Sequence, residues 1–145
     1  RGEGTMVRRF AKFDDYVGEI PQRTNGVAIA QEEGVATPYA IFNISERVQM
    51  FIEPGTKVYE GMIIGVANRG EDIVVNACRK KQLTNTRASG SDDALRLVPP
   101  RQMSLEQCLE FLADDELLEV TPKSLRMRKA ILNHEQRMKS LKSKK

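Results

Sequence analysis

Short apolar runs, each closed by turn-forming residues, dominate the first hundred positions of the chain. They recur at intervals of roughly ten residues, which is typical of an antiparallel sheet or a small barrel. Asn25-Gly26 and Glu53-Pro54-Gly55 are turn sequences, and Pro38 predicts an edge or a bulge in its run. Gly61 and Gly65 predict a bulge or a close backbone approach. We expect strands at residues 4–13, 27–30, 35–44, 47–52, 58–66, 73–78 and 95–98.

A helical pattern begins after Pro99-Pro100. Ser104 with Gln107 three residues later forms a capping box, and apolar residues at helical spacing follow it. We expect a helix at about residues 105–114, with its apolar face in the core and its acids in water. Residues 117–121 should be extended, because Thr121 precedes a proline.

Residues 125–128 alternate apolar and basic and admit two interpretations. A strand would place Arg126 and Arg128 on one outward face, whereas a helix could begin with Ser124 as its cap; we prefer the strand. From Ala130 onward the chain is helix-prone and ends in a basic tail that we expect to be frayed. The predicted fold is α+β: a β-rich antiparallel sheet or small barrel-like body, one helix, a long basic loop and a basic C-terminal segment.

Charge is segregated along the chain. The net charge is only +3, yet residues 106–119 contain acids and no Lys or Arg, whereas residues 123–145 hold nine Lys or Arg and one acid. A basic end of this kind predicts a nucleic-acid partner or pairing with the acidic segment. The 145 residues suit one domain or slightly more. We find no apolar run of membrane-spanning length and no signal peptide, and we take the chain as a piece of a longer protein.

The segment 79–91 is the main candidate for a functional site. Its cations are Arg79, Lys80, Lys81 and Arg87, and it contains no acid. Short donor side chains among cations suit a phosphate backbone, because they donate hydrogen bonds while the cations displace counterions. A solvated, flexible connection explains the composition equally well. In the RNA interpretation the other contact residues are Thr84, Asn85, Ser89 and Gly90.

A second basic group follows the acidic segment and could form a second RNA surface. It consists of Lys123, Arg126, Arg128, Lys129 and Arg137. Neither basic group contains an aromatic residue, so we expect recognition of RNA backbone and shape rather than base stacking.

No catalytic or metal-binding constellation stands out in the sequence. Cys78, Cys108 and His134 lack metal-ligand spacing, and both cysteines suit small core positions. Asp114-Asp115-Glu116 lacks the spacing of a calcium loop and is better explained as a solvated helix end. The chain also lacks the Gly-x-x-x-x-Gly-Lys-Ser/Thr loop that cradles nucleotide phosphates. We therefore expect no catalysis, metal or cofactor in this chain.

Several stretches from end to end match the motifs of one known family. Residues 81–94, with Leu83-Thr84-Asn85-Thr86-Arg87-Ala88-Ser89-Gly90, resemble the hallmark stretch of the TypA/BipA translational GTPases. The similarity continues at Pro99-Pro100 and at residues 103–107, 114–122 and 124–129, and upstream at residues 58–65, 22–26 and 1–4.

This resemblance implies a domain assignment and partners. Residues 1–30 would end a fifth domain like that of elongation factor G, and residues 31–145 would form the TypA/BipA-type C-terminal domain. GTP and Mg²⁺ would bind in N-terminal domains that this chain lacks. The chain would be a cytoplasmic monomer without membrane contact. It would dock on large-subunit ribosomal RNA, reach the acceptor end of A-site tRNA, and support large-subunit assembly and growth under cold or other stress.

A protein-interaction domain is the alternative function. The acidic helix would then carry a protein partner, and the basic tail would fold back on that helix. Salt dependence does not separate the two functions, because charged protein interfaces also weaken with salt. Competition by ribosomal RNA separates them.

Overall fold

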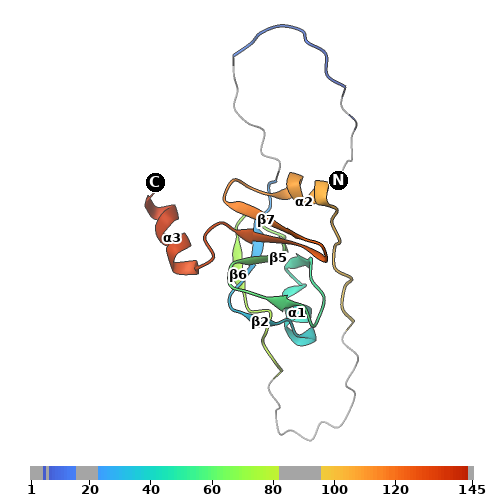
Figure 1. The fold of residues 1–145 in the computed structure, drawn as a ribbon, viewed down its shortest axis with the longest axis vertical. Helices are drawn as coiled ribbons and strands as arrows, with labels where there is room; N and C mark the ends of the chain where they lie inside the picture. The colour runs from blue at the N-terminus through green and yellow to red at the C-terminus, as the bar shows by residue number, and fades with distance from the viewer. Residues whose placement is uncertain (1–4, 6, 16–22, 82–95, 144–145) are drawn as a thin grey trace, which may run out of the picture.

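The computed structural model describes residues 5, 7–15, 23–81 and 96–143 (Figure 1). Its elements are β1 (Val27–Ala30), β2 (Gly34–Val35), α1 (Pro38–Ile44), β3 (Val48–Met50), β4 (Lys57–Val58), β5 (Met62–Ala67), β6 (Ile73–Val75), α2 (Leu105–Phe111), β7 (Glu116–Thr121), β8 (Ser124–Lys129) and α3 (His134–Ser143). The main sheet has the order β6-β1-β5-β8-β7, with β3 also pairing with β5, and β2 and β4 form a separate ladder. The α+β prediction is confirmed, with a mostly antiparallel sheet that stays open across the described residues.

Strand β5 is the centre of the sheet, because it pairs antiparallel with β1, β3 and β8. Its register against β1 shifts between Ala28 and Ile29, which leaves Ile64 as the extra residue of a bulge. A Cβ at Gly65 would lie 2.4 Å from Cγ1 of Val48 and 2.6 Å from the carbonyl oxygen of Gln49. The sequence prediction of a bulge or close approach in this run is therefore confirmed.

Apolar side chains cover both faces of β1, so this strand is fully buried. Ala28 and Ala30 belong to a large cluster with α1, and Val27 and Ile29 belong to a smaller one with Cys108 and Met127. Figure 1 shows the sheet between α1 and α2. Cys108 is a core residue as predicted, and Cys78 is half-buried against the large cluster. The domain boundary expected at residue 30 stays a prediction. In the structure, β1 pairs with β5 and β6, both of which follow that boundary in sequence.

The predicted strand at residues 35–44 is wrong, because Pro38–Ile44 is helix α1. The Thr37 hydroxyl accepts the Ala40 N–H at 3.1 Å as an N-cap. Pro38 then opens the helix, where its missing N–H costs nothing. Ala40, Ile41 and Ile44 point to the core at helical spacing. The apolar run therefore has a helical period that its β-branched composition concealed.

Four further predictions are corrected by the structure. Residues 7–13 form no strand, and Val7 and Phe13 are more than nine-tenths exposed, because no neighbouring strand offers them a ladder among the described residues. Residues 96–98 form no strand either; Leu97 alone packs on the core. Helix α2 ends at Phe111 because the Ala113 N–H bonds to the carboxylate of Glu116 instead of continuing the helix. The pairing of β1 with β6 is parallel.

The C-terminal third follows the sequence pattern more closely. The Ser104–Gln107 capping box is present, β7 is extended, and residues 125–128 lie in strand β8 rather than in a helix. Helix α3 starts at His134, so the structure contains three helices in its described part rather than one. Among the described residues, no helix has the length and apolar composition needed to cross a membrane.

Candidate nucleic-acid interface

The basic loop leaves the body immediately after β6, and its first residues are held by Thr37. The hydroxyl of Thr37 caps α1 and also donates to the carbonyl oxygen of Arg79 at 2.5 Å. The Thr37 N–H donates to the carbonyl oxygen of Ala77 at 3.0 Å. Arg79, Lys80 and Lys81 are exposed, and no acid of the described chain forms an ion pair with them. Three adjacent cations therefore leave the body from a fixed backbone position.

Replacing Thr37 with Val keeps the shape of the side chain and removes both hydroxyl hydrogen bonds. We expect the free energy of unfolding to fall by about 1–2 kcal/mol, the usual cost of losing an N-cap. Urea titration measures this change. Thr56→Val is the matched control, because its hydroxyl makes no hydrogen bond in the described chain, and it should change stability by no more than about 0.5 kcal/mol. Equal losses in the two variants would contradict this role of Thr37.

Five of the predicted contact residues lie outside the described residues. They are Thr84, Asn85, Arg87, Ser89 and Gly90. Where the description resumes, Arg96 and Arg101 are exposed on the arm that returns to α2. Neither arginine was predicted from the sequence, although Arg96 lies five residues after the basic segment, Arg101 lies ten residues after it, and neither has an acid as its immediate neighbour in sequence.

The β7–β8 hairpin presents part of the second basic group to solvent. Lys123 at its turn and Arg126 on its strand are exposed. Nε of Arg128 lies 2.9 Å from Oε1 of Glu119, without the alignment of a hydrogen bond, so a carboxylate already balances much of its charge. Burial together with the hydrogen bond to Glu119 raises the pKa of Tyr59 to about 12, which keeps this phenol a donor. Lys123 and Arg126 are thus better placed for phosphates than Arg128.

Lys129 lies inside the protein and is unavailable to RNA, so we remove it from the candidate interface. It is 2 % exposed, and its ammonium contacts Asp72 at 2.7 Å, Glu116 at 2.9 Å and Asp115 at 3.0 Å. Burial alone would lower its pKa, but hydrogen bonds to these three carboxylates outweigh burial and raise the pKa above 10.5. Alternation on β8 puts Lys129 on the inward face with Met127, a signal that the sequence contained.

The interpretation of the acidic cluster 114–116 as a solvated helix end is also corrected, because Glu116 is buried in the core. Its carboxylate receives two hydrogen bonds from Arg23 at 2.8 Å each. It also accepts from Lys129 at 2.9 Å and from the Ala113 N–H at 3.0 Å. Arg23 lies 4.6 Å from the ring centroid of Phe111, within cation–π range. These contacts join the segment before β1 to α2, β7 and β8.

A family model for the TypA/BipA C-terminal domain matches residues 25–134. The chain belongs to this family. The match contains all eight strands and helices α1 and α2, and it ends at the first residue of α3. The resemblance of the loop motif to TypA/BipA is thereby confirmed.

Curated relatives of the TypA/BipA chain cover nearly all of its length. A large ribosomal subunit assembly factor BipA from Synechocystis sp. is 50 % identical over 129 residues, which is 89 % of this chain and 22 % of the relative. Proteins of the same name from Salmonella typhimurium and Escherichia coli K12 are 48 % and 47 % identical over 140 residues. These alignments cover 96 % of this chain and 23 % of each relative. The chain therefore spans less than a quarter of these relatives.

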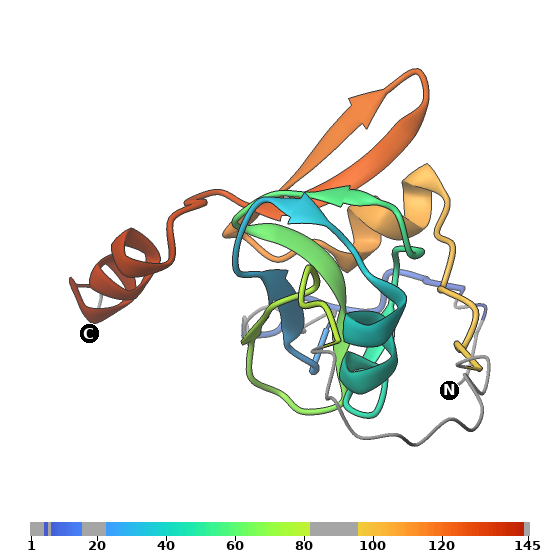
Figure 2. The same ribbon diagram turned by 90° about the horizontal axis from the view of Figure 1, so that it is seen from below.

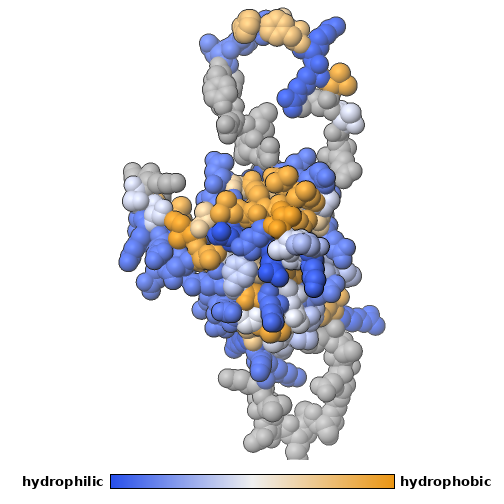
Figure 3. All heavy atoms as spheres, viewed as in Figure 1, coloured by the Kyte–Doolittle hydropathy of each residue, from blue (hydrophilic) through white to orange (hydrophobic). Residues whose placement is uncertain are grey.

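Two basic surfaces of this TypA/BipA domain lie apart. In Figure 2 the β7–β8 hairpin stands out from the top of the body, whereas residues 79–81 leave it near the bottom. Helix α3 is also separated from the acidic helix α2 in Figures 1 and 2, so the expected fold-back of the basic tail on that helix is absent from the described chain. Apolar side chains gather over α2 and β7 in Figure 3, where Leu109 and Val120 are more than half exposed.

Proposed function

We propose that this chain is an RNA-docking module that helps a ribosome-assembly factor to bind the large ribosomal subunit. The observation that carries the proposal is the exposed series Arg79-Lys80-Lys81, which has no acidic partner in the described chain and leaves from a backbone position held by Thr37. Cations of this kind bind phosphates by displacing counterions. The names of the relatives, large ribosomal subunit assembly factors, supply the class of RNA.

The proposed mechanism is positional rather than catalytic. Arg79, Lys80, Lys81 and Arg87 neutralise phosphates of ribosomal RNA. Thr84, Asn85 and Ser89 donate hydrogen bonds, and Gly90 permits a close backbone approach. The loop reaches the acceptor end of A-site tRNA, and Lys123 and Arg126 hold a second RNA surface, with a smaller contribution from Arg128. The chain acts as a cytoplasmic monomer in large-subunit assembly and in growth under cold or other stress.

Nucleotide chemistry belongs, in this proposal, to the other domains of the parent protein. This chain contains no Gly-x-x-x-x-Gly-Lys-Ser/Thr sequence, so its residues do not fit the phosphates of GTP in that mode. GTP hydrolysis and its Mg²⁺ ion are therefore assigned outside residues 1–145, and the chain catalyses nothing by itself.

The test is binding of the 145-residue chain to purified large ribosomal subunits, with small subunits as the comparison. We expect preferential binding to large subunits and displacement by large-subunit ribosomal RNA freed of its proteins. Binding that deproteinised RNA does not displace would favour the protein-interaction alternative. Absence of binding to large subunits would overturn the proposed docking function of this chain.

A further inference from the structure

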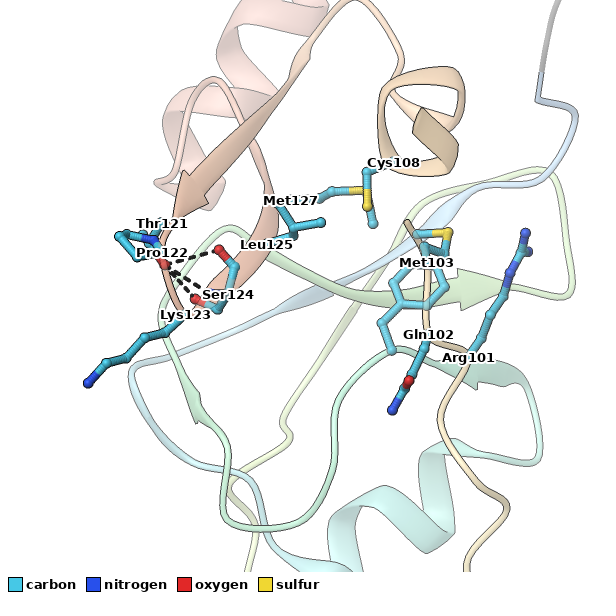
Figure 4. Close-up of a pocket in the computed structure, with 11 residues that line it drawn as sticks. Arg101, Gln102, Met103, Cys108, Thr121, Pro122, Lys123, Ser124, Leu125 and Met127 are labelled. Atoms are coloured by element: carbon cyan, nitrogen blue, oxygen red, sulfur yellow. Dashed lines mark hydrogen bonds between the residues drawn. The ribbon is translucent and has the colours of Figure 1, made fainter. Parts of the chain in front are cut away.

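A groove of about 580 Å³ lies between the turn of the β7–β8 hairpin and the segment before α2 (Figure 4). Lys123 and Ser124 of the turn border it on one side, and Arg101 and Gln102 border it on the other. All its lining residues belong to the described part of the chain. The volume falls within the range of pockets that bind small organic ligands.

The floor of the groove is apolar and rich in sulfur. Met127 and Cys108 are about 95 % buried, and half-buried Met103 and Phe51 extend the same surface. Phe51 is held edge-on against Phe111, with ring centroids 5.5 Å apart. Burial raises the pKa of the Cys108 thiol, so this group remains a neutral part of the floor. Polarisable thioethers and an aromatic ring form a suitable contact surface for a planar heterocycle.

The rim of the groove carries positive charge on a fixed backbone. Arg101 and Lys123 are exposed on opposite sides, and none of the lining residues is acidic. The N–H of Arg101 donates to the carbonyl oxygen of Met50 at 2.8 Å. At the turn, Oγ1 of Thr121 donates to the Ser124 carbonyl and accepts the Ser124 N–H, both at 3.0 Å. Binding would therefore order side chains but little backbone.

We infer that this groove receives one unstacked nucleotide of single-stranded RNA, and this inference rests on the proposed RNA-docking function. The base lies against Met103 and Met127, and the phosphates on its two sides contact Arg101 and Lys123. The amide of Gln102 and the hydroxyl of Ser124 supply donors and acceptors for base edges. Two cations without an acid favour a polyanion over an ordinary apolar peptide. The mode extends recognition beyond the backbone contacts expected from the sequence, because folding brings the aromatic ring of Phe51 and the cation of Lys123 to the lining of one groove.

The first test follows the methionine methyl groups by NMR while hexauridylate is added to the chain. A stacked base should shift the methyl signals of Met103 and Met127, whereas those of Met50 and Met62 in the other cluster stay in place. Unmoved groove methyls would overturn the inference. So would equal shifts produced by a duplex RNA, which offers no unstacked base, or by hexaglutamate, which would indicate an acidic protein partner.

The second test removes the rim cations with the double variant Arg101→Ala, Lys123→Ala. Hexauridylate affinity should fall at least about tenfold, because two charge-assisted contacts are lost. The log–log salt slope should flatten by about 1.4, since each single-strand contact contributes about 0.7. Arg47→Ala, Lys57→Ala removes the same charge at exposed positions outside the groove. It should leave the affinity for hexauridylate within about twofold and the salt slope unchanged.

Parallel measurement of large-subunit binding separates the two proposals. If the unmodified chain binds large subunits and Arg101→Ala, Lys123→Ala leaves hexauridylate affinity unchanged, the nucleotide site in the groove is refuted and the proposed function is not. Loss of subunit binding by the unmodified chain would refute the proposed function. The nucleotide site would be established by shifts of the groove methyl signals together with a lower hexauridylate affinity and a flatter salt slope in the rim variant.

Discussion

A chain in which Arg79, Lys80, Lys81 and Arg87 are all replaced by Ala should bind purified large ribosomal subunits much more weakly and with a flatter salt dependence. Each phosphate contact contributes about 0.7–0.9 to the slope of log affinity against log salt. Loss of four contacts should therefore reduce the slope by about 3–4 units. Equilibrium binding across a salt series measures this change directly.

The matched control removes four other exposed cations from elsewhere in the chain. Arg8, Arg47, Lys57 and Arg69 are exposed and lie outside both basic surfaces. Their replacement by Ala changes the net charge equally, so it corrects for long-range attraction between the chain and RNA. Equal slopes for the two quadruple variants would contradict a specific role of the loop. An unchanged slope in the loop variant with intact binding would move the interface to Lys123 and Arg126.

Replacing Glu116 with Gln should destabilise the domain by about 3–5 kcal/mol, because it leaves the largely buried guanidinium of Arg23 without its carboxylate. The Glu116 side chain is fully buried, and that of Arg23 is 15 % exposed. Asp72 and Asp115 still contact Lys129 in the variant, but the described chain offers Arg23 no second carboxylate. Chemical denaturation with linear extrapolation measures the loss.

The same contacts predict how stability depends on pH. Burial by itself would raise the pKa of Glu116, but hydrogen bonds from Arg23, Lys129 and Ala113 outweigh burial and hold it below 4.5. A lowered native pKa means that this stabilisation is present above the unfolded pKa and is lost as pH falls through the native value. The raised pKa of Lys129 acts in the opposite direction: its stabilisation is present below pH 10.5 and is lost above the native value. In Glu116→Gln the free energy of unfolding should therefore depend less on pH in the acid range than it does in the unmodified chain.

Glu119→Gln is the control for this prediction. Glu119 also pairs with an arginine of β8, but its side chain is 38 % exposed, and such pairs contribute no more than about 1 kcal/mol. The amide oxygen of Gln can still accept from Tyr59. If both variants lost equal stability, the buried contacts of Glu116 would not be a main support of the fold.

Local patterns in the sequence were sufficient for several elements and for the family. The Ser104–Gln107 capping box, the alternation in β8 and the glycines of β5 depend on interactions between near neighbours or on steric limits at one residue. Those signals survive any tertiary arrangement. The run Thr37-Pro38 was also readable as a helix start, and the apolar residues that follow it led to the wrong period.

The sequence alone determined which residues are charged, where the loop cations lie, and that this chain belongs with the TypA/BipA domains. Only the tertiary structure decided which charges are available to a partner. Lys123 and Lys129 are both lysines of one hairpin, yet one is exposed and the other contacts three carboxylates from two separate segments. Folding also placed Arg101 and Lys123 on one groove. Alternation along β8 indicates that Lys129 faces inward, but pairing depends on distant segments meeting in space, and no single segment encodes which carboxylates contact this lysine.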